Sequence, residues 1–294
     1  RAPDAGAIHL VPGGRAGLVT GDGWTIAPPE LEMVNFGSRL RAGDVDADGH
    51  PDLVEGSATR WSDPGHAAYC AGSPTGPSEC RRLGSAGATS LAVADVDDDG
   101  RADIVQGNAA LPPVSDVAGE VLVWLGGSEG PSSSPISITQ ETRGVPGHNQ
   151  AGDRFGAVVD AGDVDGDGYA DMVIGAPGES GFAGRITVVR GGRDGLATTA
   201  HSSFDQKSPA VPGRRRTGSR FGSAIAVLQL TDDRRLDVAV AARGEDGGEQ
   251  IMVVEGGPGV FAPAETRTST LKGAGRYVRA EPGVLLRLAR TSGG

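Results

Sequence analysis

One nine-residue pattern rich in aspartate occurs three times in this chain of 294 residues, and it constrains the fold more than any other feature. The copies read DVDADGHPD from Asp44, DVDDDGRAD from Asp95 and DVDGDGYAD from Asp163. A worn fourth copy, QLTDDRRLD, begins at Gln229, so successive starts are 51, 68 and 66 residues apart. Self-similarity at such a spacing is typical of an architecture in which repeated units pack against their neighbours.

Short apolar runs repeat together with the aspartate pattern. Each copy is followed by a run that a strand would bury, namely LVEG, IVQG, MVIG and VAVA. Runs this short, bounded by glycine, indicate strands rather than helices. Further apolar runs that end in glycine lie at 119–127, 184–192 and 249–257, with a divergent copy at 66–73 and a fifth at 6–14. A weaker strand is expected after each, as at 24–27 and 136–139.

The repeated unit therefore reads as strand A, aspartate loop, strand B, variable loop, strand C, glycine turn and strand D. The 49 glycines and 19 prolines exclude a protein built of long helices. Four-stranded antiparallel units in tandem are the signature of a β-propeller, because radial packing buries faces that one unit alone would expose. The sequence predicts an all-β fold of this kind.

The motifs resemble the FG-GAP family, the calcium-binding propeller repeats of the integrin α-subunit head and of many bacterial extracellular proteins. The fullest copy combines Phe155-Gly156, the loop 163–171 and Gly175-Ala176-Pro177. Phe-Gly also precedes the first and fourth loops, at Phe36 and Phe221, but is missing before Asp95. The resemblance implies one FG-GAP-type propeller domain over residues 1–294.

The number of blades follows from counting strands. There are five copies of strand C but only four clear A–B pairs, and the segment 277–289 could supply the fifth pair. We therefore expect about five blades with the two termini sharing one blade, so that residues 6–14 pair with residues 284–289. Because the integrin members of the family are seven-bladed, the alternatives are a seven-bladed propeller, a fragment or an open arc.

The aspartate loops have the chemistry of a calcium site. Calcium takes six to eight oxygen ligands, and alternate carboxylates with a glycine at the sixth position can supply them from a tight turn. The helix–loop–helix alternative needs a twelve-residue loop that ends in Glu, whereas these loops end in Asp between β-like runs. We expect about three calcium ions, with position 7 contributing its backbone carbonyl. The predicted ligands are Asp44, Asp46, Asp48, His50 and Asp52; Asp95, Asp97, Asp99, Arg101 and Asp103; and Asp163, Asp165, Asp167, Tyr169 and Asp171.

The fourth loop lacks most of these groups. Gln229 and Thr231 replace carboxylates, and Arg234 replaces the glycine, while Asp233 and Asp237 remain. An arginine beside the site supplies positive charge where a cation would bind, so this loop is expected to hold no calcium.

The two cysteines and the net charge indicate in which compartment the protein works and which partners are disfavoured. Cys70 and Cys80 lie on either side of a predicted C–D turn, so adjacent antiparallel strands can bring them together, and we expect a disulfide and an oxidising compartment.

The net charge of −11 disfavours binding to nucleic acid and to anionic membranes, and no apolar run is long enough to predict a membrane helix. Arginine greatly outnumbers lysine, which suggests a high-GC bacterial genome. We expect a secreted or cell-surface monomer with no membrane insertion.

No catalytic motif explains the function. GGSEG at 126–130 matches a hydrolase nucleophile pattern formally, but it falls in the same C–D turn that elsewhere carries no serine. We therefore expect a non-catalytic domain that binds a protein or glycan through the B–C and D–A loops, opposite the calcium loops. The candidate contact residues are Trp61, His148, Arg214, Arg215 and Arg216. The alternatives are an enzyme with its site in the central funnel or loop face, marked by paired carboxylates or a His with an acid, and an accessory domain of a larger hydrolase or lyase.

Overall fold

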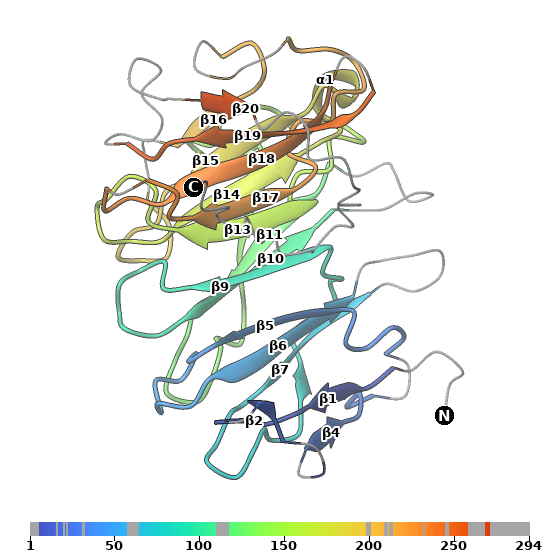
Figure 1. Ribbon diagram of the computed structural model, residues 1–294, viewed down its shortest axis with the longest axis vertical. Coiled ribbons are helices and arrows are strands. Elements are labelled where there is room, and N and C mark those ends of the chain that lie inside the picture. Colours follow the sequence, from blue (N-terminus) through green and yellow to red (C-terminus); the bar gives the residue numbers. More distant parts are fainter. Residues whose placement is uncertain are drawn as a thin grey trace.

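The computed structural model describes residues 6–257, apart from 16, 20, 22, 31–32, 58–64, 110–117, 198–200, 209–210, 212–213, 232 and 245–246, together with a strand at 268–270. The described residues are almost entirely β-structure and form four sheets of four strands and two sheets of two strands (Figure 1). This confirms the predicted all-β fold of four-stranded blades.

Each four-stranded sheet is one repeat unit, and all its neighbouring strands are antiparallel. In chain order from A to D, the strands are β5 (Arg39–Gly43), β6 (Asp52–Ser57), β7 (His66–Cys70) and β8 (Arg81–Arg82); β9 (Ser90–Ala94), β10 (Asp103–Asn108), β11 (Glu120–Trp124) and β12 (Ile136–Ile138); β13 (Val158–Gly162), β14 (Asp171–Ala176), β15 (Arg185–Val189) and β16 (Ser202–Phe204); and β17 (Ile225–Leu228), β18 (Asp237–Arg243), β19 (Glu249–Val254) and β20 (Thr268–Thr270).

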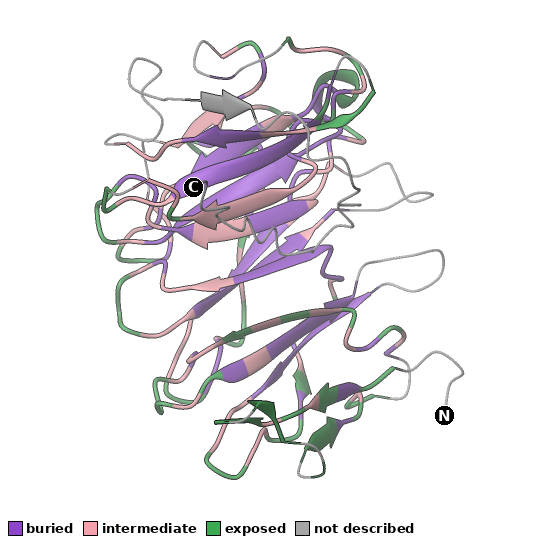
Figure 2. Ribbon diagram, in the orientation of Figure 1, coloured by how far each residue is buried: buried purple, intermediate pink, exposed green. Residues whose placement is uncertain are grey.

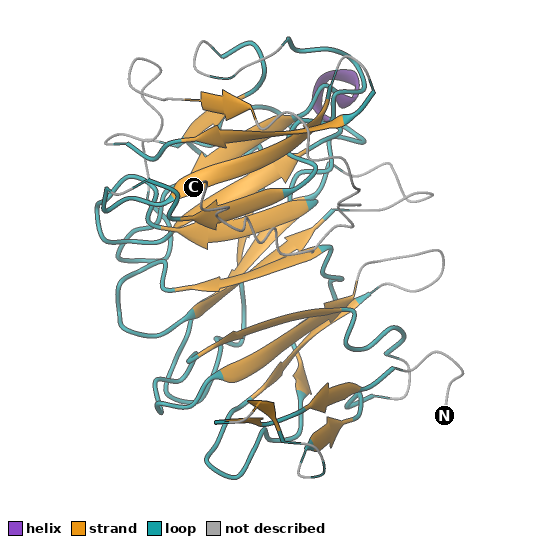
Figure 3. Cartoon of the chain, in the orientation of Figure 1, coloured by secondary structure: helices purple, strands orange, loops and turns teal. Residues whose placement is uncertain are grey.

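The aspartate loop occupies the same position in every unit. Its ninth residue opens strand B and pairs with the last residue of strand A, as in Gly43 with Asp52 and Gly162 with Asp171. The register is the same for Ala94 with Asp103 and holds even in the worn copy, at Leu228 with Asp237. All four loops therefore leave their sheets at one end, which we call the aspartate end (Figure 3).

The blades pack through their A strands and the apolar faces behind them. Strand β9 lies beside β5 and β13, and β13 lies beside β17. Between successive sheets lie clusters of buried side chains, which include Trp124, Phe155 and Phe221. Figure 2 shows the resulting distribution, with buried central strands and a more exposed N-terminal region.

The Phe-Gly motifs are joints between neighbouring blades. Gly184, which precedes strand C of one blade, forms a parallel bridge with Phe221, which precedes strand A of the next. Gly119 lies equally close to the backbone of Phe155, and the φ angles of Gly119 and Gly184 are positive, at 100° and 86°. A Cβ at either glycine would collide with the phenylalanine backbone, so the motif and its glycine partner are required together.

The N-terminal segment is an incomplete blade within the described residues. Strand β1 (Ile8–Leu10) pairs with β4 (Trp24–Ile26), and β2 (Gly13–Gly14) pairs with β3 (Gly17–Leu18) between them. Leu18 and Trp24 are 74% and 40% exposed. The segment 277–289 that would complete this blade lies outside the described residues, so the closed five-blade arrangement stays a prediction.

Truncation tests the proposed sharing of a blade by the two termini. We expect a chain that ends at residue 276 to lose amide exchange protection in β1 and to melt at a lower temperature, because an edge strand would lose its partner. Hydrogen exchange with mass spectrometry measures this. A control chain that ends at residue 289 keeps the predicted pairing segment and should retain protection. Equal protection of β1 in both chains would contradict the pairing.

Candidate functional site

Carboxylates gather at the aspartate end in three places. In each intact loop, three aspartates form a triplet in which one carboxylate oxygen of each residue lies within 4.8 Å of the other two. The triplets are Asp44, Asp46 and Asp48; Asp95, Asp97 and Asp99; and Asp163, Asp165 and Asp171. The structure thus brings together nine of the residues predicted to bind calcium. The carbonyls expected from His50, Arg101 and Tyr169 remain predicted ligands.

Backbone amides hold the first carboxylate of each loop in place. In the second loop, the Asp95 Oδ1 and Oδ2 atoms accept the N–H groups of Asp99 and Gly100, at 3.2 and 2.9 Å. Asp44 accepts the corresponding amides of the first loop at 3.1 and 3.0 Å. This turn needs a left-handed residue at position 6, and Gly100 has a φ of 85°.

The ninth aspartate has a role that the sequence did not reveal. Both oxygens of Asp103 accept backbone N–H groups, from Val96 at 2.8 Å and from Gly126 at 2.7 Å. The first amide belongs to the loop itself and the second to the turn after strand C. Asp52 and Asp171 make the same two contacts in their own blades. That these aspartates are also calcium ligands stays a prediction. In the structure, each of their carboxylates joins its own loop to the turn after strand C, and we call this pair of hydrogen bonds the clasp.

The electrostatics of these loops suit a hard cation. Burial, reinforced by neighbouring carboxylates, raises the pKa of Asp46 and Asp97. Burial is also the main cause that raises the pKa of Asp103 and of Asp171 to about 7. In the second loop, Asp97 Oδ1 is buried and lacks a hydrogen-bond partner. A divalent cation would neutralise these charges and satisfy that oxygen, so the donor set fits Ca²⁺.

The third loop differs from the first two because an arginine reaches into it. Arg190, which follows β15, places one guanidinium nitrogen against Asp165 and 2.6 Å from Asp167 Oδ2. The corresponding residues of the other blades are Ala71, Leu125 and Glu255. Among the described residues, a counter-charge from the turn after strand C is thus found in the third loop alone, whereas in the second loop Asp99 pairs at 2.8 Å with Arg101 of the same loop. Sequence analysis had no motif that would have placed Arg190 there.

The fourth loop has the same fold as the others but lacks the carboxylates of their first and third positions. Asp237 is buried and accepts the amides of Leu230, Thr231 and Gly256 at 2.8, 2.9 and 3.1 Å. Asp233 is bound to the Arg235 amide. No metal-type triplet occurs in this loop among its described residues. The prediction that it holds no calcium stays open.

Neighbouring aspartate loops are tied to one another through the backbone. The carbonyl of the first residue in one loop accepts the N–H of the eighth residue in the next loop. The pairs are Asp44 with Ala102 at 2.9 Å, Asp95 with Ala170 at 3.0 Å and Asp163 with Leu236 at 3.0 Å. A change in one loop therefore bears directly on the packing of its neighbour.

The variable loops meet at the opposite end, which we call the loop end. It consists of the D–A loops 140–157 and 205–222 and the B–C loop 177–184. The amide of Gly178 donates to Asp153 O, and that of Arg220 donates to Phe182 O. These bonds hold the three loops together, and Figure 1 shows α1 (Glu179–Phe182) at this end.

The predicted contact residues occupy varied settings. His148 is 83% exposed and lies 3.7 Å from Glu141. Arg215 pairs with Asp205 at 3.3 Å, while Arg214 is exposed. Arg216 donates to the Arg243 carbonyl at 3.5 Å and has a buried Nε with no hydrogen-bond partner. Trp61 lies outside the described residues.

A second group at the loop end was missed by sequence analysis. The guanidinium carbons of Arg154 and Arg220 lie 5.4 and 5.7 Å from the ring centroid of Phe182, which is 38% exposed. All three residues have positive φ, at 59°, 50° and 61°. For a bulky residue this conformation costs about 1–2 kcal/mol. The repeated Arg-Phe-Gly at 154–156 and 220–222 was a signal that could have pointed to the arginines.

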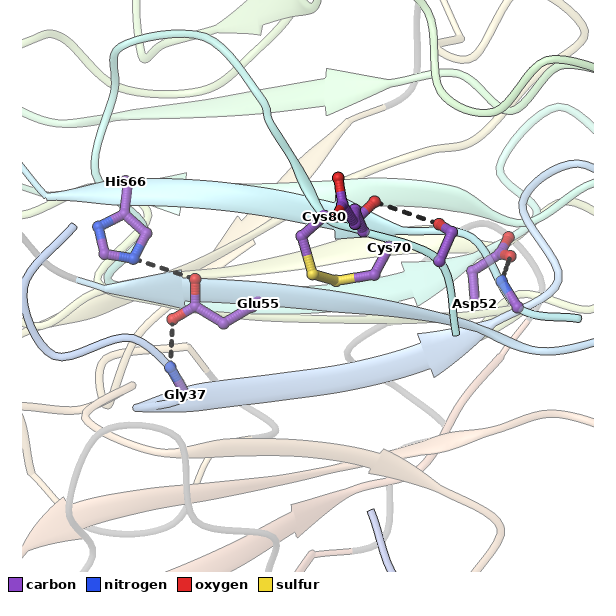
Figure 4. The surroundings of a disulfide bond; sticks show 9 residues. Gly37, Asp52, Glu55, His66, Cys70 and Cys80 are labelled. Carbon is purple, nitrogen blue, oxygen red and sulfur yellow. Dashed lines mark hydrogen bonds and ion pairs between the residues drawn. A yellow bond between two sulfur atoms is a disulfide. The ribbon is translucent and has the colours of Figure 1, made fainter. Parts of the chain in front are cut away.

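The predicted disulfide is confirmed, since Cys70 and Cys80 are bonded across the edge of strands β7 and β8 (Figure 4). Nearby, His66 Nε2 lies 3.1 Å from Glu55 and its Nδ1 lies 3.0 Å from the Ser57 hydroxyl. A histidine with an acid was the sign expected of an enzyme. These three side chains are at most 1% exposed, however, and Glu55 also accepts the Gly37 amide, so the group stabilises the blade interior.

Comparison with known proteins agrees with the geometry. The family model described as "FG-GAP repeat" matches residues 155–189. Integrin alpha pat-2 of Caenorhabditis briggsae is 28% identical over 252 residues, which are 72% of this chain and 18% of that protein. Human integrin alpha-D is 32% identical over 171 residues, 56% of this chain and 14% of that protein. Phosphatidylinositol-glycan-specific phospholipase D of Rattus norvegicus is 34% identical over 100 residues, 33% of this chain and 12% of that protein.

The chain spans less than a fifth of the length of these relatives. Its likeness to them therefore concerns only a part of each of these proteins. In the part of the chain that the structure describes, the helices are too short and too polar to cross a membrane.

Removal of calcium should destabilise the protein. One site at a hundred times its dissociation constant contributes about 2.7 kcal/mol, which corresponds to a shift in Tm of about 5–10 °C for a chain of this size. We expect chelator to lower the Tm by at least this amount, and Asp165→Ala to lower it more than Asp233→Ala. Scanning calorimetry in calcium and in chelator tests this. Identical melting curves would show that the loops do not need the metal.

Loss of the ninth aspartate should destabilise a blade whether or not calcium is present. Asp237→Asn removes a buried charged acceptor of three backbone amides, so we expect the free energy of unfolding to fall by about 2–4 kcal/mol. Denaturant unfolding of this variant and of Asp233→Asn, an exposed control, should be measured with calcium and with chelator. A loss that appears only in calcium would mean that Asp237 acts through a metal.

Proposed function

We propose that this FG-GAP repeat protein is an extracellular calcium-binding adhesion propeller that binds a protein ligand at its loop end and has no catalytic centre of its own. The observation that carries the proposal is the threefold clustering of carboxylate oxygens within 4.8 Å at the aspartate end. All three clusters contain the first and third residues of their loop, joined by the fifth residue in the first two loops and by the ninth, Asp171, in the third. Such clusters in three equivalent loops are expected of a repeated ion site rather than of a single reaction centre.

Calcium would have a structural role here. The three triplets would hold one ion each, and the ninth aspartate would keep the loop bonded to the turn after strand C; in the third loop, Asp171 would do both. Because each loop is bonded to the next through the first-residue carbonyls, an ion in one loop would also support the neighbouring blade. The ions would thereby fix the relative positions of the blades and of the loops at their far ends.

The loop end is the better candidate for ligand contact. Two of its three loops, 140–157 and 205–222, are longer than the aspartate loops, and function in repeat folds is carried by such variable segments. The integrin α relatives support an adhesion role, and the disulfide supports an oxidising, extracellular compartment. A glycan ligand is the outcome that the experiment below must separate from a protein ligand.

The test screens the chain against an array of extracellular proteins and glycans. A bulky group attached at one end of the molecule or the other then shows at which end the ligand binds. We expect at least one protein on the array to bind the chain in calcium and to be released by chelator. A polyethylene glycol chain attached through Thr217→Cys, at the loop end, should abolish this binding. The same group attached through Asp194→Cys, in the C–D turn at the aspartate end, should leave it intact.

Two results would overturn the proposal. One is a ligand that is blocked from Asp194→Cys and not from Thr217→Cys, which would move the contact to the aspartate end. The other is binding confined to glycans, which would replace the protein ligand.

A further inference from the structure

Three residues from three separate loops converge at the loop end. Arg154 comes from the β12–β13 connection, Phe182 from α1 and Arg220 from the β16–β17 connection. The guanidinium carbons lie 5.4 and 5.7 Å from the centroid of the same phenyl ring, and the Arg220 amide donates to Phe182 O at 2.8 Å. We call these three residues the Arg–Phe–Arg cluster.

No carboxylate that the structure describes pairs with either guanidinium group of the cluster. Within 4.0 Å of Arg154 or Arg220 there is no described carboxylate, whereas Arg185 and Arg215 each have one and Arg190 has two. Burial and the nearby Arg220 lower the pKa of Arg154, as expected of like charges held together. Such an arrangement is unusual in a chain with a net charge of −11, and an external anion would relieve it.

Nearby acids do not fill this role. Asp153 and Glu179 belong to the same loops but are only 3% and 6% exposed. Glu179 accepts the Gln140 side chain at 3.0 Å and lies 3.5 Å from Arg185. Asp205 is engaged by Arg215. The Arg–Phe–Arg cluster therefore remains open to a ligand.

The turns themselves do not require arginine. The residue before Phe-Gly in the first blade is Asn35, which adopts the same positive φ of 61°. In all three turns the carbonyl of this residue accepts the amide three residues on, at 3.1 Å for Asn35 and 3.0 Å for both arginines. Asparagine is among the residues best suited to this conformation. The arginines thus occupy it at a conformational disadvantage, and so does the exposed Phe182, which is a pattern associated with functional positions.

We propose that the Arg–Phe–Arg cluster is the docking site for an acidic peptide segment, in which one or more carboxylates lie beside an apolar side chain. This inference rests on the proposed function, because it assigns the chemistry of the ligand that binds the loop end. The planar guanidinium forks match carboxylates, and the exposed part of the Phe182 ring offers apolar area. A peptide can supply both groups side by side. A sulfated glycan supplies the charge without a large apolar side chain to cover the ring.

The test uses a library of twelve-residue peptides displayed on phage, with the calcium-loaded chain as bait. Selected peptides should be enriched in Asp or Glu next to an aromatic or aliphatic residue, and their affinity should fall as salt is added. Fluorescence anisotropy then measures each peptide against variants. We expect at least a tenfold loss of affinity in Arg154→Asn with Arg220→Asn, and again in Phe182→Gly.

These variants are chosen so that the fold survives. Asparagine at both positions copies Asn35, and glycine at 182 relieves the positive φ, so Tm should not fall. Arg193→Ala, an exposed arginine in the C–D turn at the aspartate end, is the matched control and should bind peptide normally.

Three outcomes would overturn the inference: selected peptides without acidic residues, acidic peptides that bind all variants equally well, or a sulfated glycan that binds the cluster while no acidic peptide does. If the block at Thr217→Cys abolishes binding but the cluster variants do not, the inference fails while the proposed function stands. If that block has no effect, the proposed function fails as well.

Discussion

A buried aspartate at the start of strand B is the contact on which each blade depends. Its carboxylate accepts an amide from the loop before it and an amide from the turn after strand C, so one side chain closes the aspartate end of three strands. A charged acceptor that is buried and fully bonded is worth more than a neutral one, because its removal leaves amides without partners. The worn fourth loop has lost its glycine and two carboxylates but keeps Asp237 with the same contacts. The clasp therefore persists where the triplet of carboxylates does not.

The clasped loops form a continuous chain around the aspartate end. Each first-residue carbonyl binds an amide of the next loop, so the loops cannot open independently. The Phe-Gly joints form a second set of inter-blade contacts, exemplified by the bridge of Gly184 with Phe221. Between these two levels, the apolar faces of adjacent sheets pack into separate clusters. The blades are thus held together by repeated backbone bonds, and this leaves the side chains of the opposite loops free to vary.

The two ends differ in how they use positive φ. At the aspartate end, the sixth position of each intact loop is glycine, which adopts that conformation without strain, and the small or short side chains of Ala47 and Asp98 adopt it at the fourth position of the first two loops. At the loop end, Arg154, Phe182 and Arg220 adopt it despite having side chains that disfavour it. Positive φ at repeated positions of equivalent loops is consistent with a stabilising role, and positive φ at large side chains on an irregular surface is consistent with recognition. The proposed division of labour between ion binding and ligand binding follows this difference.

The sequence by itself determined the repeat, the strands and the carboxylate triplets. Each of these depends on residues close together in the chain, whose spacing is visible in a string of letters, and the disulfide joins strands linked by one short turn. Only the tertiary structure decided that the ninth aspartate is a clasp, because its second amide comes from a turn about twenty residues away. Likewise, Arg190 meets the third loop, and Arg154 meets Arg220 across Phe182, only once separate strands and loops have packed. Local spacing sets turns and strands, whereas contacts between distant loops depend on the closure of the sheets around them.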